Sequence, residues 1–397
     1  MLQQALDGIK VLDFTRVLAG PFASMMLGDL GAEVVKVEPP AGDESRTWPP
    51  ILEKGESGYF TILNRNKRSI TLNLKEPRAR EIARRLAAGF DVVLENFTPG
   101  VVRKLGIDYE TFKKENPGIV YCSISGFGQD GPYRDKKAYD PIIQGMTGLM
   151  SITGERGRSP VKVGIPITDL VAANQAVTAV LAACIHRQRT GEGQYIDVSL
   201  YDGIVSLLTI MAMDYFATGK PPDRWGLDHI HRVPARAFAA KDGRYVQVAA
   251  TSDSMYPAFC RVIGAEELID DPRFRTNTDR VDNREEIMPI LEEKMQARTA
   301  AEWLPLFEAA KIPCGPVLDM AEVFADPNIA ARDLLFDMPH PREAWVQQLG
   351  FPFKMEKTPA SARRRPPLLG EHNEEVLSEY LSLTAEEVAA LKTDGVI

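Results

Sequence analysis

The sequence predicts an α/β protein built around a mostly parallel β-sheet with helices on its faces. Between residues 9 and 125, short apolar runs rich in β-branched residues alternate with segments of helical periodicity. This alternation is typical of strands joined by crossover helices. The chain has 397 residues, 44% of them hydrophobic, which is enough for two domains or one elaborated domain.

Five strands are expected in the first third of the chain, at residues 10–14, 33–37, 70–74, 91–95 and 119–125. Helical periodicity covers residues 22–30 and 76–88, and the second helix has Pro77 in its first turn, where a missing N–H costs nothing. Crossovers between parallel strands are right-handed, so these elements form one α/β layer.

The rest of the chain continues this layer and then changes character. A long helix is expected to end near Gly191, followed by a strand at 194–200 and a helix at 202–218. Gly and Pro residues at 219–223 indicate a linker. Beyond residue 235, a smaller domain is indicated by a strand at 244–250, a helix at 254–263 and two helices within 283–311. A Pro- and Arg-rich return at 341–367 leads to a helical tail at 371–392.

Composition narrows the classes of function. No apolar run approaches the ~20 residues of a membrane helix, and the amino terminus lacks a basic stretch followed by an apolar core, so a cytoplasmic protein is expected. The four cysteines are far apart and are expected to be reduced core thiols, and no histidine motif indicates a metal. A net charge of -8 argues against a protein that coats nucleic acid but is compatible with a small anionic ligand.

Basic residues are dense at three places in the first third of the chain: Arg65, Lys67 and Arg68; Arg103 and Lys104; Arg134, Lys136 and Lys137. The second cluster and Asn96 with Phe97 follow the fourth expected strand, and the third cluster follows the fifth strand. Ligands of open α/β sheets bind beyond the carboxyl ends of the strands, so a site is expected at this edge. For each cluster alone, a solvated charged face is the alternative explanation.

Asp169 is the first candidate for a reactive group. It stands in an apolar segment with Gly and Pro, residues 163–170, directly before a small-residue run at 171–188. At a helix start, free N–H groups and the macrodipole favour an ionised carboxylate, and such a carboxylate can attack an activated acyl group without a general base. Thr168 and Asp169 also have the side chains of a helix cap, so the local sequence leaves both roles open.

A glycine motif after the fifth strand invites a different interpretation. Residues 126–131, Gly-Phe-Gly-Gln-Asp-Gly, satisfy G-x-G-x-x-G, but a dinucleotide site also requires a helix that starts within the motif. Pro132 follows at once, and residues 133–140 are polar without apolar periodicity. A Gly-rich loop beside the site is therefore expected instead, and its N–H groups are candidates to stabilise an oxyanion.

Several segments taken together resemble the family III CoA-transferases, the group that includes formyl-CoA and carnitine CoA-transferases. The segments that carry the resemblance are residues 12–21 (LDFTRVLAGP), 31–38 (GAEVVKVE), 64–70 (NRNKRSI), 95–100 (ENFTPG), the block around Asp169, 312–317 (IPCGPV) and 367–372 (PLLGEH). They occur in order across nearly the whole chain. The resemblance implies a large Rossmann-like α/β domain built from both chain ends, and a smaller α+β domain from the middle, in an interlocked-ring homodimer. The corresponding ranges are 1–220, 221–325 with flanking linkers, and 326–397.

The resemblance also implies that Asp169 is the catalytic nucleophile, which forms a mixed anhydride with an acyl-CoA and then an aspartyl-CoA thioester that passes CoA to a free carboxylic acid. Because the reference pKa of Asp is about 3.9, the carboxylate is expected to be ionised at neutral pH. Coenzyme A is a substrate in this scheme, and no permanently bound cofactor or metal is expected. The implied CoA contacts are Val17, Leu18, Leu72, Asn73, Leu74, Lys75, Asn96, Phe97, Thr98, Lys104, Lys137, Ala138, Tyr139 and Asp140.

Two departures from the formyl-CoA branch bear on the substrate. Leu18 stands in place of a glutamine, and residues 223–250 contain no run of glycines, which makes oxalate and formate less expected substrates. Arg232 or Arg236 in that region is a candidate to bind the distal carboxylate of a dicarboxylic acid, since Arg suits bidentate recognition; exposed arginines at a domain junction are the alternative.

Two other functions stay open at this level. An α-methylacyl-CoA racemase needs a second base, and its G-H-D motif is replaced here by Ala138, Tyr139 and Asp140. A CoA-binding protein without catalysis would use Asp169 only as a cap.

Overall fold

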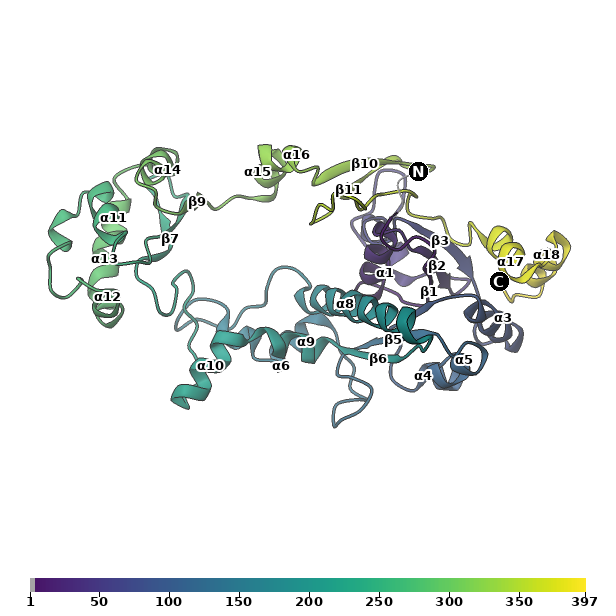
Figure 1. Ribbon diagram of the computed structural model, residues 1–397. Coiled ribbons are helices and arrows are strands. Elements are labelled where there is room, and N and C mark those ends of the chain that lie inside the picture. Colours follow the sequence, from purple (N-terminus) through teal and green to yellow (C-terminus); the bar gives the residue numbers. More distant parts are fainter. Residues whose placement is uncertain (1–3) are drawn as a thin grey trace. The chain divides into compact units, whose positions relative to one another are not determined.

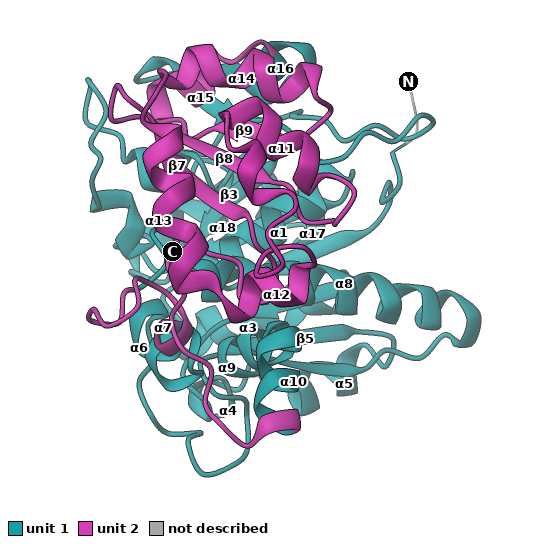
Figure 2. Cartoon of the chain, turned by 90° about the vertical axis from the view of Figure 1, so that its left-hand side faces the viewer, with its two compact units in different colours: residues 1–149, 162–216, 328–397 teal, residues 150–161, 217–327 magenta. Residues whose placement is uncertain are grey.

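A computed structural model describes residues 4–397 of the chain (Figure 1). The expectation for the amino terminus concerns residues 1–3 in part, and these lie outside the described residues. The chain forms two compact units, one of residues 1–149, 162–216 and 328–397 and one of residues 150–161 and 217–327, drawn in teal and magenta in Figure 2. Residues 150–161 group with the second unit, whereas the sequence analysis assigned them to the large domain. Units of mutual contact are not a test of independent domains, so the domain division stays a prediction.

The first unit is built on a six-stranded parallel sheet, which confirms the predicted α/β fold with a central parallel sheet. The strands are β1 (Lys10–Asp13), β2 (Glu33–Glu38), β3 (Lys67–Thr71), β4 (Val92–Glu95), β5 (Val120–Ser125) and β6 (Tyr195–Ser199). Their order in the sheet, β3-β2-β1-β4-β5-β6, is that of a doubly wound sheet. The order reverses between β1 and β4, and the crevice beyond this point is where such sheets bind ligands.

Helices cover both faces of this sheet, as Figure 1 shows. The helices up to residue 218 are α1 (Ala19–Asp29), α2 (Gly58–Thr61), α3 (Pro77–Ala88), α4 (Val101–Leu105), α5 (Tyr109–Glu115), α6 (Asp140–Met146), α7 (Leu149–Ile152), α8 (Ile167–Thr190), α9 (Leu200–Leu207) and α10 (Thr209–Thr218), and a 3-10 turn spans Glu44–Thr47. The tail adds α17 (Asn373–Leu381) and α18 (Ala385–Thr393). Successive strand residues point to opposite faces, so Val11 belongs to a core with α1 and α8, whereas Leu12 belongs to a core with α3, α5, α17 and α18.

The second unit has its own core around a three-stranded antiparallel sheet, β7 (Ala235–Ala239), β8 (Tyr245–Ala249) and β9 (Cys314–Pro316). Its helices are α11 (Tyr256–Ile263), α12 (Asn277–Asp282), α13 (Arg284–Met295), α14 (Ala300–Ala309) and α15 (Met320–Ala325), with a 3-10 turn at Glu266–Leu268. The fully buried Trp303 and Phe307 of α14 stack in this core. The two helices expected within residues 283–311 are thus confirmed as α13 and α14.

Several strand assignments in the sequence analysis differ from the structure: β7 and β9 of the second unit were not predicted, and two segments of the first unit also differ. The third strand begins at Lys67 rather than at residue 70, because charged side chains that look unsuited to a central strand are neutralised there by buried carboxylates. The return segment begins with α16 (Pro327–Ala331) and contains an antiparallel hairpin, β10 (Leu335–His340) and β11 (Ala344–Leu349), where only a Pro- and Arg-rich connection was expected.

The expectation that no apolar segment reaches membrane length is wrong for α8. Its 24 residues are long and apolar enough to cross a membrane by length and composition, and α9 with α10 passes the same test as a pair bent by 67°. The helix itself was predicted, but uncharged polar residues interrupt its apolar runs without lowering its mean hydropathy much, so no continuous apolar run marks it in the sequence. Core helices of α/β proteins meet the same criterion, and one face of α8 packs on α1 and the sheet.

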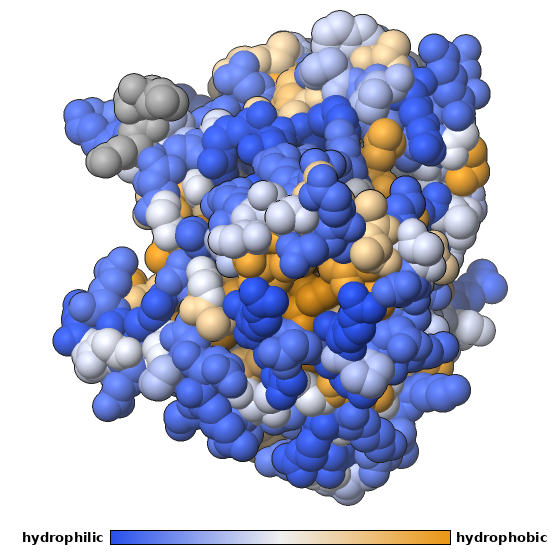
Figure 3. Space-filling view, turned by 90° about the vertical axis from the view of Figure 1, so that its right-hand side faces the viewer, coloured by the Kyte–Doolittle hydropathy of each residue, from blue (hydrophilic) through white to orange (hydrophobic). Residues whose placement is uncertain are grey.

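The outer helices present a polar surface. Figure 3 shows the side of the molecule on which α3, α17 and α18 lie in Figure 1, and hydrophilic residues predominate there, with apolar residues gathered in the middle of the view. The four cysteines are free thiols, and Cys122, Cys184 and Cys260 are buried, as expected of core residues.

Candidate active site

Asp169 lies where the amino-terminal ends of two helices meet. It is the third residue of α8, and the backbone N–H groups that favour its ionised form are its own and that of Ala19, the first residue of α1. The residue before α8 is Pro166, and no side chain caps this helix. Asp169 therefore does not act as the N-cap that the sequence allowed. Its partly buried carboxylate instead bridges two helix starts, both of which favour negative charge.

Burial and a neighbouring charge oppose this stabilisation. Burial, and after it the negative charge of Asp140, raise the pKa of Asp169 to about 7, although the N–H groups of Asp169 and Ala19 act in the other direction. The expectation that this carboxylate is fully ionised at neutral pH is therefore wrong for the free protein. A carboxylate with a pKa near neutrality is a stronger nucleophile when ionised than one held well below its reference value.

Asp140 anchors the segment that leads into α8. Its Oδ1 accepts a hydrogen bond from the N–H of Thr168 at 3.0 Å, and its Oδ2 accepts one from Gln144 Nε2 at 2.7 Å. The side-chain oxygen of Gln144 accepts in turn from the N–H of Val163 at 2.8 Å. These bonds fix both ends of the turn that contains the Gly and Pro residues before Asp169. The sequence analysis assigned Asp140 only to CoA binding and did not identify Gln144.

Tyr59 was not predicted as a site residue, because nothing in its local sequence indicates that it lies near Asp169. Burial raises the pKa of its hydroxyl to about 12, and the charges of Asp169, Asp43 and Asp140 add to this effect. The phenol therefore stays protonated and offers a hydrogen-bond donor among three carboxylates.

The implied CoA contacts Val17 and Leu18 lie in the turn between β1 and α1. Val17 has a φ of 67°, a left-handed conformation that is unusual for a β-branched residue. Its N–H is donated to the carboxylate of Asp43, at 3.3 and 3.2 Å from the two oxygens. Any contact of Val17 with CoA is thus left to its carbonyl or side chain.

Asn96 to Thr98 follow the carboxyl end of β4 and reach the same turn. The amide of Asn96 accepts from the N–H of Arg16 at 3.0 Å and donates to its carbonyl at 2.8 Å, and the guanidinium of Arg16 lies 5.6 Å from the ring centre of Phe97. Much of the hydrogen-bonding capacity of Asn96 is therefore used within the protein. Phe97 N–H is bound by Glu95, whose pKa burial raises to about 7.

Three exposed lysines are available to bind the phosphates of CoA. Lys104, in the last turn of α4, and Lys137, before α6, are exposed, and within residues 4–397 neither forms an ion pair. Both follow strands at the predicted edge, as do Lys75 after β3 and the neighbouring Leu72, Asn73 and Leu74. Leu72, however, is a core residue, and Asn73 donates its N–H to Val396, so Lys75 is the exposed member of that group.

The first basic cluster of the sequence analysis is neither a solvated face nor a phosphate site. Lys67 is fully buried and paired with Asp13 at 3.2 Å, and Arg65 is buried against Asp29 at 2.6 Å. Arg68 is bound by three glutamates of β2 and α17. These cations neutralise carboxylates under the sheet and are unavailable to a ligand.

The glycine loop packs against the segment that carries Lys137. A Cβ on Gly126 would lie 2.1 Å from that of Ala138, so glycine is required for this approach. No helix begins within residues 126–131, which removes the condition for a dinucleotide site. The N–H of Gly128 is donated to Ser125 and that of Gln129 to Asp197, so these two groups are not free to stabilise an oxyanion.

The two substrate arginines lie in the second unit and differ in their surroundings. The guanidinium of Arg236 is held by Glu292 at 2.7 Å and lies 3.5 Å from Asp228. A substrate carboxylate would have to displace these anions, which disfavours Arg236 as a ligand. Arg232 is exposed and forms no ion pair within residues 4–397. Its role stays a prediction.

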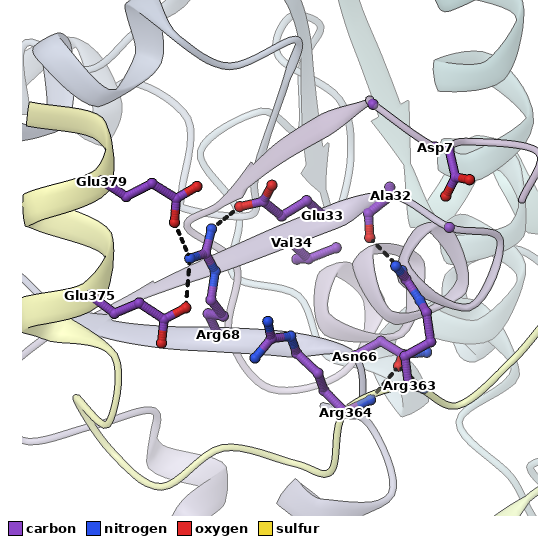
Figure 4. A pocket seen from close by; sticks show the side chains of 12 residues that line it. Asp7, Ala32, Glu33, Val34, Asn66, Arg68, Arg363, Arg364, Glu375 and Glu379 are labelled. Atoms are coloured by element: carbon purple, nitrogen blue, oxygen red, sulfur yellow. Dashed lines mark hydrogen bonds and ion pairs between the residues drawn. The ribbon is translucent and has the colours of Figure 1, made fainter. Parts of the chain in front are cut away.

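A polar hollow at the opposite edge of the sheet is a separate feature. It has a volume of about 380 Å³ and lies at the amino ends of β2 and β3 (Figure 4). Figure 4 shows Arg68 between Glu33, Glu375 and Glu379, and Arg363 directed at the carbonyl of Ala32. Arg68 is bound by glutamates of β2 and α17, and Arg363 donates to the carbonyls of Gly28 and Ala32, so these contacts attach the carboxyl-terminal segment to the first unit's sheet and helix α1.

Comparison with known proteins shows the family to which the chain belongs. The profile of CoA-transferase family III matches residues 6–373. The chain belongs to CoA-transferase family III. The human succinyl-CoA:glutarate CoA-transferase is 41% identical over 393 residues, covering 99% of this chain and 90% of that protein. The acetyl-CoA:oxalate CoA-transferase of Acetobacter aceti is 42% identical over 331 residues, covering 83% of this chain and 85% of that protein.

Solved structures agree with this family. The crystal structure of a CAIB/BAIF family protein from Brucella suis matches with a TM-score of 0.86 at 40% identity, covering 95% of this chain and 100% of that one. The predicted enzyme class is confirmed: the chain is a family III CoA-transferase, which uses an acyl-CoA as substrate.

Proposed function

We propose that this family III CoA-transferase moves CoA from an acyl-CoA to a free dicarboxylic acid through a covalent intermediate on Asp169. The observation that carries the proposal is the carboxylate of Asp169 at the joined amino-terminal ends of α1 and α8. The exposed Lys104 and Lys137 follow β4 and β5, at the edge of the sheet where such folds bind ligands, and they support a CoA site there.

The reaction proceeds by two reversible exchanges. The ionised carboxylate of Asp169 attacks the thioester carbonyl of the acyl-CoA, the C–S bond breaks, and a mixed anhydride and the CoA thiolate result. The thiolate attacks the aspartyl carbonyl, which releases the donor acid as a carboxylate and leaves an aspartyl-CoA thioester. The acceptor carboxylate then repeats these steps in reverse order and regenerates Asp169. No proton is gained or lost overall, so the mechanism needs no general base.

A pKa near neutral pH suits Asp169 to the role of nucleophile. The group must leave as a carboxylate from an anhydride and attack as a carboxylate, and a pKa of about 7 supplies both an ionised fraction and a basic nucleophile. The Tyr59 hydroxyl is a donor for the oxyanion of either tetrahedral intermediate.

Mass spectrometry after incubation with succinyl-CoA and hydroxylamine tests the intermediate. A hydroxamate on Asp169 is expected, and it should be absent from Asp169→Asn and from samples without acyl-CoA. Asp202→Asn, an exposed carboxylate at the corresponding position of α9, is the matched control and should retain the adduct. If the α-proton of a 2-methylacyl-CoA exchanged for deuterium without an adduct on Asp169, the protein would be a racemase instead. If neither reaction occurred, it would be a CoA-binding protein without catalysis.

The dicarboxylate class is supported by the named relatives and by an exposed arginine. According to their names, two of the relatives act on the dicarboxylic acids glutarate and oxalate. Arg232 is the candidate for the distal carboxylate, since its guanidinium is free of the anions that occupy Arg236.

Arg232→Ala is expected to raise the KM for glutarate about tenfold, in line with the loss of one charge-assisted contact, and to leave the KM for a monocarboxylate unchanged. Arg261→Ala, an exposed arginine of α11, serves as the control. Equal effects of Arg232→Ala on both classes of acid would contradict the assignment.

A homodimer and a cytoplasmic location also belong to the proposal. Large apolar side chains of α9 and α10 are exposed, among them Leu207, Ile210, Met213 and Phe216, at 54, 62, 61 and 72%. Such a surface is expected to be covered by a partner. Light scattering in solution should give twice the mass of the chain, and a monomer at assay concentrations would refute this part.

A further inference from the structure

The turn before α1 is held by buried groups that the reaction itself does not use. Residues 14–18 connect β1 to α1, and the backbone N–H of Ala19, next to them, favours the ionised form of Asp169. The direction of that N–H depends on the backbone of the turn, because the peptide planes before a helix fix how its first donors point.

Three residues of this turn, Thr15, Arg16 and Val17, are each bound by a side chain from outside the turn. The carbonyl of Thr15 accepts from Lys36 Nζ at 2.7 Å, and the N–H of Thr15 is donated to Asp13 at 2.9 Å. Both backbone polar groups of Arg16 are bound by the side chain of Asn96. The N–H of Val17 is bound by Asp43.

The conformation at Val17 explains why such restraints are needed. With a φ of 67°, its branched side chain lies in a region that β-branched residues almost never occupy, and such strain persists only where surrounding contacts over-determine it. The turn is also closed tightly, since a Cβ on Gly20 would lie 2.2 Å from that of Thr15. Without its restraints the turn would relax, and the N–H of Ala19 would turn away.

Asp43 connects this turn to the buried charges. It is 3% exposed, its Oδ2 lies 3.0 Å from Lys36 Nζ, and its Oδ1 accepts from the hydroxyl of Ser45 at 2.8 Å and from the N–H of Ser45 at 3.0 Å. Burial opposes its ionisation, but Lys36 and Ser45 outweigh that effect and lower its pKa to about 2. Asp43 is thus an anion throughout the working pH range and cannot release Val17 by protonation.

We infer that Asp43 is a positioning residue for the transferase reaction: by holding Val17 in its left-handed conformation, its carboxylate aims the N–H of Ala19 at Asp169. This inference rests on the proposed role of Asp169 as nucleophile. In this role Asp43 acts on Asp169 through the turn, and its charge also helps to raise the pKa of Tyr59.

The acidic limb of the pH profile of kcat/KM measures this effect, because it reports the pKa of Asp169 in the free enzyme. Loss of the Ala19 hydrogen bond removes a contact that favours the ionised form, so Asp43→Asn is expected to move the limb upward by about one pH unit. A displacement of the nucleophile should also lower kcat about 10- to 100-fold. Ser45→Ala, which removes one of the bonds to Asp43, should move the limb in the same direction by a smaller amount.

Two further variants separate positioning from a loss of stability. Asp29→Asn removes a carboxylate that is equally buried and bound to Arg65, but at the far end of α1, and it should lower the Tm without moving the limb. Val17→Gly added to Asp43→Asn should return the limb at least half-way, because glycine adopts a positive φ without a steric penalty.

The outcomes are distinct. The inference is overturned if the acidic limb of kcat/KM does not shift in folded Asp43→Asn. It is also overturned if adding Val17→Gly does not move the limb back toward its wild-type position. If Asp43→Asn does not fold, an unshifted limb in Ser45→Ala overturns it. Asp169→Asn is assayed alongside: activity in that variant would refute the proposed nucleophile, whereas an inactive Asp169→Asn with an unshifted Asp43→Asn refutes positioning alone.

Discussion

Replacing Asp169 by asparagine should stabilise the enzyme at alkaline pH relative to the wild type. The folded protein keeps the Asp169 proton up to a pH of about 7, whereas the unfolded chain loses it near 3.8. Between these values the folded state binds more protons, so the wild type loses stability as the pH rises from about 4 to about 7. The asparagine variant has no such proton and no such loss.

The structure sets the size of this effect. A shift from 3.8 to about 7 is roughly three pKa units, and at ~1.4 kcal/mol per unit the ionised group costs up to about 4 kcal/mol. Most of this cost falls between pH 5 and pH 8, where it amounts to about 2.5 kcal/mol. Partial exposure of the carboxylate makes this an upper bound, since water screens the charge.

Urea unfolding of both proteins at pH 5 and pH 8, at one protein concentration, measures the difference. The free energy of unfolding of Asp169→Asn minus that of the wild type should increase by about 1 to 2.5 kcal/mol between the two pH values. Glu95, whose pKa burial also raises to about 7, is present in both proteins and cancels. Asp202→Asn should show no such increase. A difference for Asp169→Asn that is the same at both pH values would refute the raised pKa.

Three further predictions concern the same edge of the sheet. Asp140→Asn removes the charge beside Asp169, so the acidic limb of kcat/KM should move to lower pH; a limb that stays in place would show that this charge does not act on the nucleophile. Lys104→Ala and Lys137→Ala should each raise the KM for acyl-CoA about 3- to 10-fold, more at low salt, whereas the exposed Lys114→Ala on α5 should not. Gly20→Ala should lower the free energy of unfolding by about 1 to 3 kcal/mol and reduce kcat, because its Cβ meets Thr15; wild-type stability in thermal unfolding would contradict the close packing of the turn.

The parallel sheet was predictable because apolar strand residues and helical periodicity are local signals. The strand at Lys67 was placed three residues late, since a buried lysine in a central strand is recognisable only once its partner Asp13, far away in the sequence, is known to lie beside it. For the same reason the basic cluster at Arg65 looked like a ligand site. The sequence shows which side chains are charged, but only the fold shows which of them already form ion pairs within the protein.

The candidate nucleophile was predictable only through the resemblance, because the first turn of a helix favours carboxylates for structural reasons as well. The sequence could not predict that the start of a second helix, α1, lies beside Asp169. The N–H of Ala19 comes from a turn that is 150 residues away along the chain, and Asp140 and Tyr59 approach Asp169 from two other elements.

These surroundings act on the carboxylate of Asp169 in opposite directions, and the balance between them sets its pKa. Two helix starts alone would hold Asp169 as a stable anion of low basicity, and burial with Asp140 alone would keep it protonated at neutral pH. Together they place its pKa near 7, where the group is both ionised and basic. The strained turn at Val17 is one cost of bringing the second helix start into place, and the raised pKa of Asp169 is another. The strain at Val17 and the raised pKa of Asp169 both lower the stability of the folded protein. Substitution of Asp169 should therefore change mainly the pH dependence of stability, whereas substitution of Asp43 should change the pH profile of kcat/KM.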